Sequence, residues 1–117
     1  MDRLSEHREE LSKSFFGSAY MLVIVNEIVH CADAEGRFTA PDVIEATRLP
    51  ASTVHSVLNR LKRGRVVRRT GISTPERLAI YERRPSRVWD FAQELEEEAR
   101  EVENGYLDEL WQRHRIA

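Results

Sequence analysis

Short polar side chains fall at helical spacing in the middle of the sequence. A helix over residues 51–63 would place them opposite an apolar stripe made of Val54, Val57, Leu58 and Leu61. Hydroxyl, imidazole and amide groups exchange hydrogen bonds with base edges, and asparagine pairs bidentately with adenine. The side chains that we expect to read bases are Ser52, Thr53, His55, Ser56 and Asn59.

Basic residues surround this polar face. Phosphate contacts position a protein on a duplex, whereas base contacts specify the sequence. The chain as a whole has a net charge of −2, which by itself argues against a polyanion as the partner. Residues 37–87, however, carry +8, between −4 for residues 1–36 and −6 for residues 88–117. This segregation favours one face that meets double-stranded DNA. The candidate phosphate contacts are Thr39, Arg60, Lys62, Arg63, Arg68, Arg69 and Arg77.

Local signals predict the elements that position the polar face. Thr39 and Pro41 are typical of a helix start, and Pro50 ends that helix. Gly64 then ends the helix over residues 51–63. The composition of residues 66–70 and 77–81 predicts a two-stranded ribbon with its tip at residues 71–76. Because an isolated hairpin is marginally stable, we expect the ribbon to lie on the helices.

Two long helices are predicted on either side of this region. Residues 11–32 are apolar on most helical faces and end near Gly36. A helix from residue 85 towards His114 carries one apolar stripe with an eleven-residue repeat. So small a body cannot cover both helices, and we therefore predict a homodimer. The predicted interface consists of Phe15, Tyr20, Val88, Phe91, Leu95, Ala99, Val102, Tyr106 and Leu110.

A regular motif spacing runs through residues 38–81. Its members are Leu49, Ser52-Thr-Val54, Leu58, Leu61, Gly64 and Val66-Val-Arg68. With this spacing, the stretch resembles the winged helix-turn-helix of bacterial transcription regulators of the ArsR and MarR families. Arg48 stands where the turn often has glycine, and Pro50 stands where a capping serine is usual. The resemblance implies a third helix in the major groove and a wing along the backbone or the minor groove.

We therefore expect a mainly α fold with a small β-hairpin wing, in one winged-helix domain over residues 1–117. Its parts would be an N-terminal dimerisation helix at 11–36, the helix-turn-helix and wing at 37–84, and a C-terminal dimerisation helix at 85–117. The resemblance implies a sequence-specific homodimeric regulator, usually a repressor, on a palindromic operator. Two alternatives stay open: a winged helix that serves as a protein-interaction module, and a partition-type or chromatin-type protein that coats DNA.

Other chemistry has little support in the sequence. Enzyme motifs are lacking, so we expect neither catalytic residues nor a cofactor. Cys31 lies beside His30, but no second ligand follows at zinc spacing, and we expect no metal and a Cys31 that behaves as a small apolar residue. The longest apolar run, residues 19–25, is too short to span a bilayer, so we expect no membrane contact and a cytoplasmic, nucleoid-associated protein.

A small-molecule effector stays open as a further partner. Aromatic side chains on the two long helices are the candidates to line a cleft between them, and aromatic ligands suit such a lining. The plain alternative is that these side chains form the dimer core. The residues concerned are Phe15, Phe16, Tyr20, Trp89, Phe91 and Tyr106.

Overall fold

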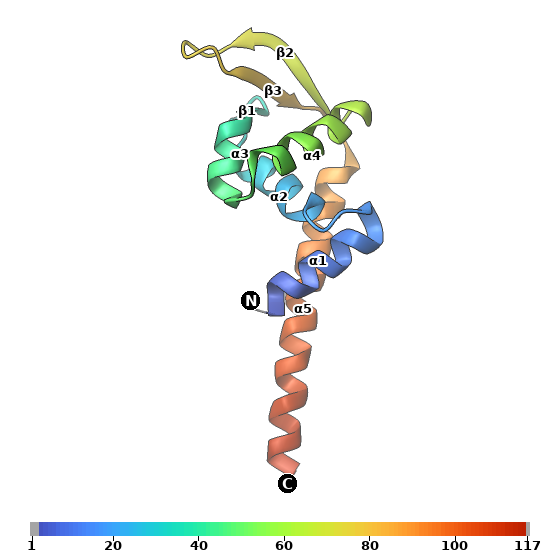
Figure 1. Ribbon diagram of the computed structural model, residues 1–117. Helices are drawn as coiled ribbons and strands as arrows, with labels where there is room; N and C mark the ends of the chain where they lie inside the picture. Colours follow the sequence, from blue (N-terminus) through green and yellow to red (C-terminus); the bar gives the residue numbers. More distant parts are fainter. Residues whose placement is uncertain (1–2, 117) are drawn as a thin grey trace.

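The computed structural model describes the backbone of residues 3–116 and the side chains of residues 6–105. Within these residues, five helices are interspersed with three strands, which form an antiparallel sheet at one end of an elongated molecule (Figure 1). The architecture is mainly α with a small wing, as predicted. The elements are α1 (Arg3–Phe16), α2 (Met21–Cys31), β1 (Arg37–Thr39), α3 (Ala40–Thr47), α4 (Ala51–Arg63), β2 (Val67–Ser73), β3 (Ala79–Arg83) and α5 (Arg87–Ile116).

Helix α2 is the centre of the core. It contacts α1, α3, α4 and α5, and its side chains Leu22, Ile24, Val25 and Ile28 are fully buried. The stripe of α4 packs into the same core, as its spacing predicts. A helix that is apolar on most sides needs neighbours on most sides, and α2 obtains them within its own chain.

The prediction of one continuous helix over residues 11–32 is wrong. Helix α1 ends at Phe16, and Gly17 adopts a φ of +73° directly after it. Helix α2 then runs at 100° to α1. Buried Ser12 stabilises the break: its hydroxyl donates to the Ser18 carbonyl and accepts from the Leu22 amide at 3.0 Å. Ser12 thereby caps a free amide at the start of α2 from outside that helix.

The two-stranded ribbon is in fact a three-stranded sheet with the order β1-β3-β2. Strand β1 pairs Phe38 with Tyr81, and their rings stack with centroids 5.8 Å apart. The tip also differs from the prediction. Gly71 lies within β2, at an irregularity in the register, and the turn falls at residues 74–77.

Helices α3 and α4 form the predicted helix-turn-helix. The Thr39 hydroxyl accepts from the Asp42 amide at 3.4 Å, so Thr39 caps α3 as expected. Arg48 ends α3 in the left-handed conformation, with φ 57°, which is the geometry that glycine adopts most easily. Pro50 occupies the N-cap position of α4 without a side-chain cap.

Helix α5 packs its first half on α1 and α2 and then projects beyond the body (Figure 1). The molecule is consequently 63 Å long and only 26 Å and 25 Å across. Leu95 and Ala99, which we predicted at the subunit contact, are buried in the core of their own chain, because α1 and α2 cover that side of α5. Tyr106 and Leu110 lie outside the residues whose side chains are described.

Candidate nucleic-acid interface

The free face of α4 carries the predicted base-reading side chains. Ser52, His55, Ser56 and Asn59 are exposed, whereas Thr53 is half-buried at the edge. The opposite side of α4 is anchored by four buried apolar residues, so the helix cannot rotate its polar face inward without exposing them. The result is a rigid helix with a row of short hydrogen-bonding groups turned outward.

Basic residues gather at the C-terminal end of α4. Asn59, Lys62 and Arg63 border one shallow hollow, and the Lys62 ammonium lies 5.9 Å from the centroid of the Tyr81 ring. Arg65 adds a further exposed side chain directly after the helix. Arg65 is not among the phosphate contacts predicted from the sequence, although it lies within the basic segment, because its outward direction depends on a left-handed backbone with φ 61°.

The strand register separates the two arginines of the wing. Arg69 is opposite Tyr81, and Arg68 is opposite Glu82. Side chains of directly opposed residues lie on the same face of the sheet, so Arg69 and Tyr81 share one face. Lys62 lies close to the Tyr81 ring on this face. Arg68 lies on the other face, away from α4. The wing therefore presents only one of the two beside the free face.

An acidic partner compensates Arg68. Its Nε donates to Glu82 Oε1 at 3.1 Å, and Arg37 Nε lies 3.7 Å from Glu82 Oε2. The hydrogen bond and charge of Arg68, together with Arg37, lower the pKa of Glu82. The carboxylate stays ionised, which reduces the positive charge that this face of the wing offers to a phosphate.

Arg60 and Arg77, two further predicted phosphate contacts, lie away from the hollow at the end of α4: Arg60 bonds to α1, and Arg77 lies in the turn at the tip of the wing. The Arg60 Nη2 donates to the Phe16 carbonyl at 2.8 Å, so this predicted phosphate contact is directed towards the end of α1. Arg77 is exposed in the tip turn with φ 68°, and its amide donates to the Thr74 carbonyl. Of the predicted phosphate contacts, Lys62 and Arg63 border the hollow at the end of α4. Arg69 lies opposite Tyr81, whose ring is close to Lys62.

Exposed aromatic side chains gather where α1 meets α5. Phe15 is 57% exposed and Phe91 is 36% exposed, and their rings meet edge to face at 5.4 Å. Tyr20 and Val102 are also exposed, whereas Val88 is half-buried. We call Phe15 and Phe91 the aromatic patch. It leaves apolar area uncovered on the acidic half of the molecule.

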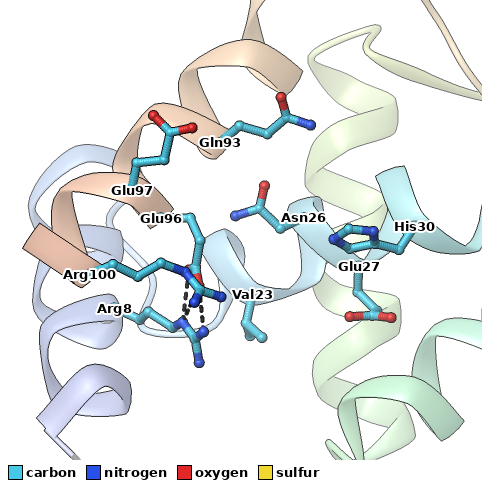
Figure 2. A pocket seen from close by; sticks show the side chains of 9 residues that line it. All are labelled: Arg8, Val23, Asn26, Glu27, His30, Gln93, Glu96, Glu97 and Arg100. Carbon is cyan, nitrogen blue, oxygen red and sulfur yellow. Dashed lines mark hydrogen bonds and ion pairs between the residues drawn. The ribbon is translucent and has the colours of Figure 1, made fainter.

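The cleft between α1, α2 and α5 is polar, unlike the aromatic cleft that we considered. Figure 2 shows its lining, in which Glu96 lies between Arg8 and Arg100. Arg8 Nε donates to both carboxylate oxygens of Glu96 at 2.7 Å. The cavity measures about 440 Å³, and among the described residues that line it Val23 alone is apolar. Trp89, in contrast, is buried and donates from its indole to the Arg84 carbonyl at 2.7 Å.

Cys31 is half-buried and directs its thiol towards Glu27 and Asp42. Burial raises the pKa of this thiol, and the two carboxylates raise it further.

No group of three His, Cys, Asp or Glu side chains within the described part of the chain is arranged to hold a metal ion. No single helix among the described residues is long and apolar enough to cross a membrane; only α1 and α2 together, bent by 100°, meet the length and composition required.

The fold is similar to that of solved winged-helix transcription regulators. MepR, a transcription regulator of the Staphylococcus aureus multidrug efflux pump MepA, superposes with a TM-score of 0.66 at 13% identity, over 97% of this chain and 82% of MepR. BpsR of Bordetella bronchiseptica gives 0.64 at 16% identity, over 98% and 86%. MarR of E. coli gives 0.63 at 13% identity, over 94% and 86%. The chain thus has a MarR-like winged-helix fold.

Sequence comparison adds no relative. No protein-family model matches the chain, and no curated protein matches it. At 13–16% identity the three structures establish the fold alone.

Proposed function

We propose that this protein is a sequence-specific DNA-binding transcription regulator that acts as a homodimer. The observation that carries the proposal is the free face of α4, where the exposed Asn59 borders one hollow with Lys62 and Arg63. Exposed Arg65 and Arg69 follow in the chain, and we call these four basic residues the basic cluster. In the proposed complex, α4 lies in the major groove, and the basic cluster holds the flanking phosphates.

Two α4 helices would occupy successive major grooves on a roughly palindromic operator, about 10 base pairs apart. The two copies would associate through the aromatic patch and α5. The acidic charge of the flanking helices favours this orientation, because it keeps α5 away from the phosphates. Occlusion of the promoter then makes the protein a repressor.

The structural neighbours support the proposal through what is known of them. A cysteine-to-serine mutant of E. coli MarR has been solved in complex with operator DNA, and a phenylalanine-to-leucine mutant of MepR has been solved bound to an oligodeoxyribonucleotide. DNA binding by BpsR is regulated by 6-hydroxynicotinic acid. By analogy we also propose a small effector for this protein, and the polar cleft beside Arg8 is its candidate position.

A salt titration of DNA binding tests the central part of the proposal. With about five phosphate contacts per subunit, log K against log salt concentration should fall with a slope of about −9. A slope near zero would reject DNA as the partner and favour the protein-interaction module.

Footprinting separates a regulator from a DNA-coating protein. We expect protection of one short site that contains two half-sites. A protected region that spreads with protein concentration would instead favour the coating protein.

A further inference from the structure

Arg60 lies at the margin of the free face of α4. Residues seven apart in a helix lie on nearly the same side, because seven residues make almost two turns. Arg60 is therefore on the side of the half-buried Thr53, whereas Arg63 is on the side of the exposed Ser56. Arg60 therefore points sideways along the body, and Arg63 points outward with the base-reading groups. The two arginines are three residues apart on one helix and face different surroundings.

The guanidinium of Arg60 meets an unsatisfied helix end. Phe16 is the last residue of α1, and the last carbonyls of a helix have no partner within that helix. Arg60 Nη2 donates to the Phe16 carbonyl at 2.8 Å, and a cation is favourable at this negative end of the helix dipole. Arg60 thus caps α1 from a different helix.

The same helix end also contacts α5. The Phe16 ring lies 5.9 Å from the centroid of Phe91, which also contacts Phe15 in the aromatic patch. Helix α1 otherwise packs chiefly on α5 and α2. The aromatic patch, the end of α1 and the Arg60 side chain on α4 thus form one continuous series of contacts.

We infer that Arg60 is a positioning residue that couples the direction of α4 to the α1–α2 turn, rather than a phosphate contact. This inference rests on the proposed function, because it assigns a role within the same DNA interface. The turn itself, residues 17–20, is held by Gly17 at φ +73° and by Ser12. In a dimer built on the aromatic patch, the turn would set the relative direction of the two α4 helices.

Arg60→Ala and its matched control Arg63→Ala separate the two roles of an arginine. Arg60→Ala should lower the affinity for the selected operator about tenfold, because only about a tenth of the molecules would then hold α4 in its binding direction, and leave the salt slope unchanged. Arg63→Ala should reduce the slope by about 1.8 for two subunits. A comparable loss of slope in Arg60→Ala, or an unchanged operator affinity, would overturn the inference.

Hydrogen exchange tests the coupling itself, with or without DNA. Without DNA, Arg60→Ala should speed exchange at the amide of Gly17, which donates to the Lys13 carbonyl at 3.0 Å, and Arg63→Ala should not. Operator DNA should slow exchange in the turn of the unmodified protein and not in Arg60→Ala, because coupling is reciprocal. Equal exchange rates in all three proteins without DNA would overturn the coupling. Failure of the unmodified protein to bind DNA would reject the proposed function instead.

Discussion

Helices α4 and α5 are both amphipathic, but they differ in what their apolar sides contact. The stripe of α4 is buried completely within its own chain, and its free face is polar and ends in basic residues. Helix α5 leaves Phe91 and Val102 exposed and carries acidic residues on its free faces. A helix whose apolar stripe is buried within its own chain can present its polar face to a ligand. An apolar side that its own chain leaves exposed is better buried against a further apolar surface, which a second copy would supply in the proposed dimer.

Charge reversal should give the largest difference between the two helices. Arg63→Glu with Arg69→Glu removes two phosphate contacts per subunit and adds repulsion, so duplex affinity should fall at least about 1000-fold. The matched control, Glu94→Lys with Glu98→Lys on α5, should change affinity less than tenfold, because charges beyond about 8 Å are screened at physiological salt. Fluorescence anisotropy measures both. Equal losses in the two variants would contradict the assignment of the helices.

Self-association should depend on the aromatic patch and not on the wing. Phe15→Ser removes an exposed ring that a dimer buries twice, and should weaken dimerisation by at least about 100-fold, with about 1.5–3 kcal/mol for each ring. Ile72→Ser, also on a half-exposed apolar residue, is the control. Sedimentation equilibrium should show the loss in the first variant only. A monomeric unmodified protein would disprove the predicted interface.

The break between α1 and α2 should depend on Ser12. Ser12→Ala leaves the buried Leu22 amide without its acceptor, which should lower the free energy of unfolding by about 1–3 kcal/mol. Ser14 is exposed and bonds only to the Glu10 carbonyl, so Ser14→Ala should cost less than about 0.5 kcal/mol. Chemical denaturation compares them. Similar midpoints for the two variants would show that Ser12 does not stabilise the break.

Asn59 and Arg69 should affect DNA binding in different ways. Asn59→Ala should reduce discrimination at one base pair by about 1–3 kcal/mol, whereas Arg69→Ala should weaken all sequences alike. Selection from a random duplex library, followed by titration, distinguishes these outcomes. The opposite pattern would exchange the roles of α4 and the wing.

The smallest effect concerns the turn between α3 and α4. Arg48→Gly relieves a left-handed residue and should stabilise the fold by about 1 kcal/mol with DNA affinity retained. Thermal unfolding measures the change. A lower melting temperature would mean that the Arg48 side chain contributes more than its backbone costs.

Local signals predicted the helix-turn-helix, because Thr39, Pro50 and Gly64 act on their immediate neighbours. The α1–α2 break escaped prediction because distant partners stabilise it: Ser12 bonds to Leu22, and Arg60 bonds to Phe16. Strand β1, which was not predicted, is only three residues long and forms by pairing with β3, far along the chain. The spacing of apolar residues along a segment cannot predict contacts with residues distant in the sequence.

The candidate site was predictable to a similar extent. Residue type and helical spacing identify the free face of α4 because α4 is an uninterrupted helix. The wing depends on register: Arg68 and Arg69 are neighbours in sequence, yet one pairs with Glu82 and the other lies beside Tyr81. The exposed direction of Arg65 likewise follows from a backbone conformation that its residue type disfavours.

Methylation protection tests most directly whether α4 reads the major groove. Dimethyl sulfate modifies guanine N7 in the major groove and adenine N3 in the minor groove, so one experiment reports on both. With the selected operator, we predict protection of guanine N7 in two segments about one helical turn apart. This protection should persist in Arg68→Ala, whose side chain lies on the face of the wing away from α4. Protection confined to adenine N3, or full reactivity of every guanine in the bound operator, would contradict the account.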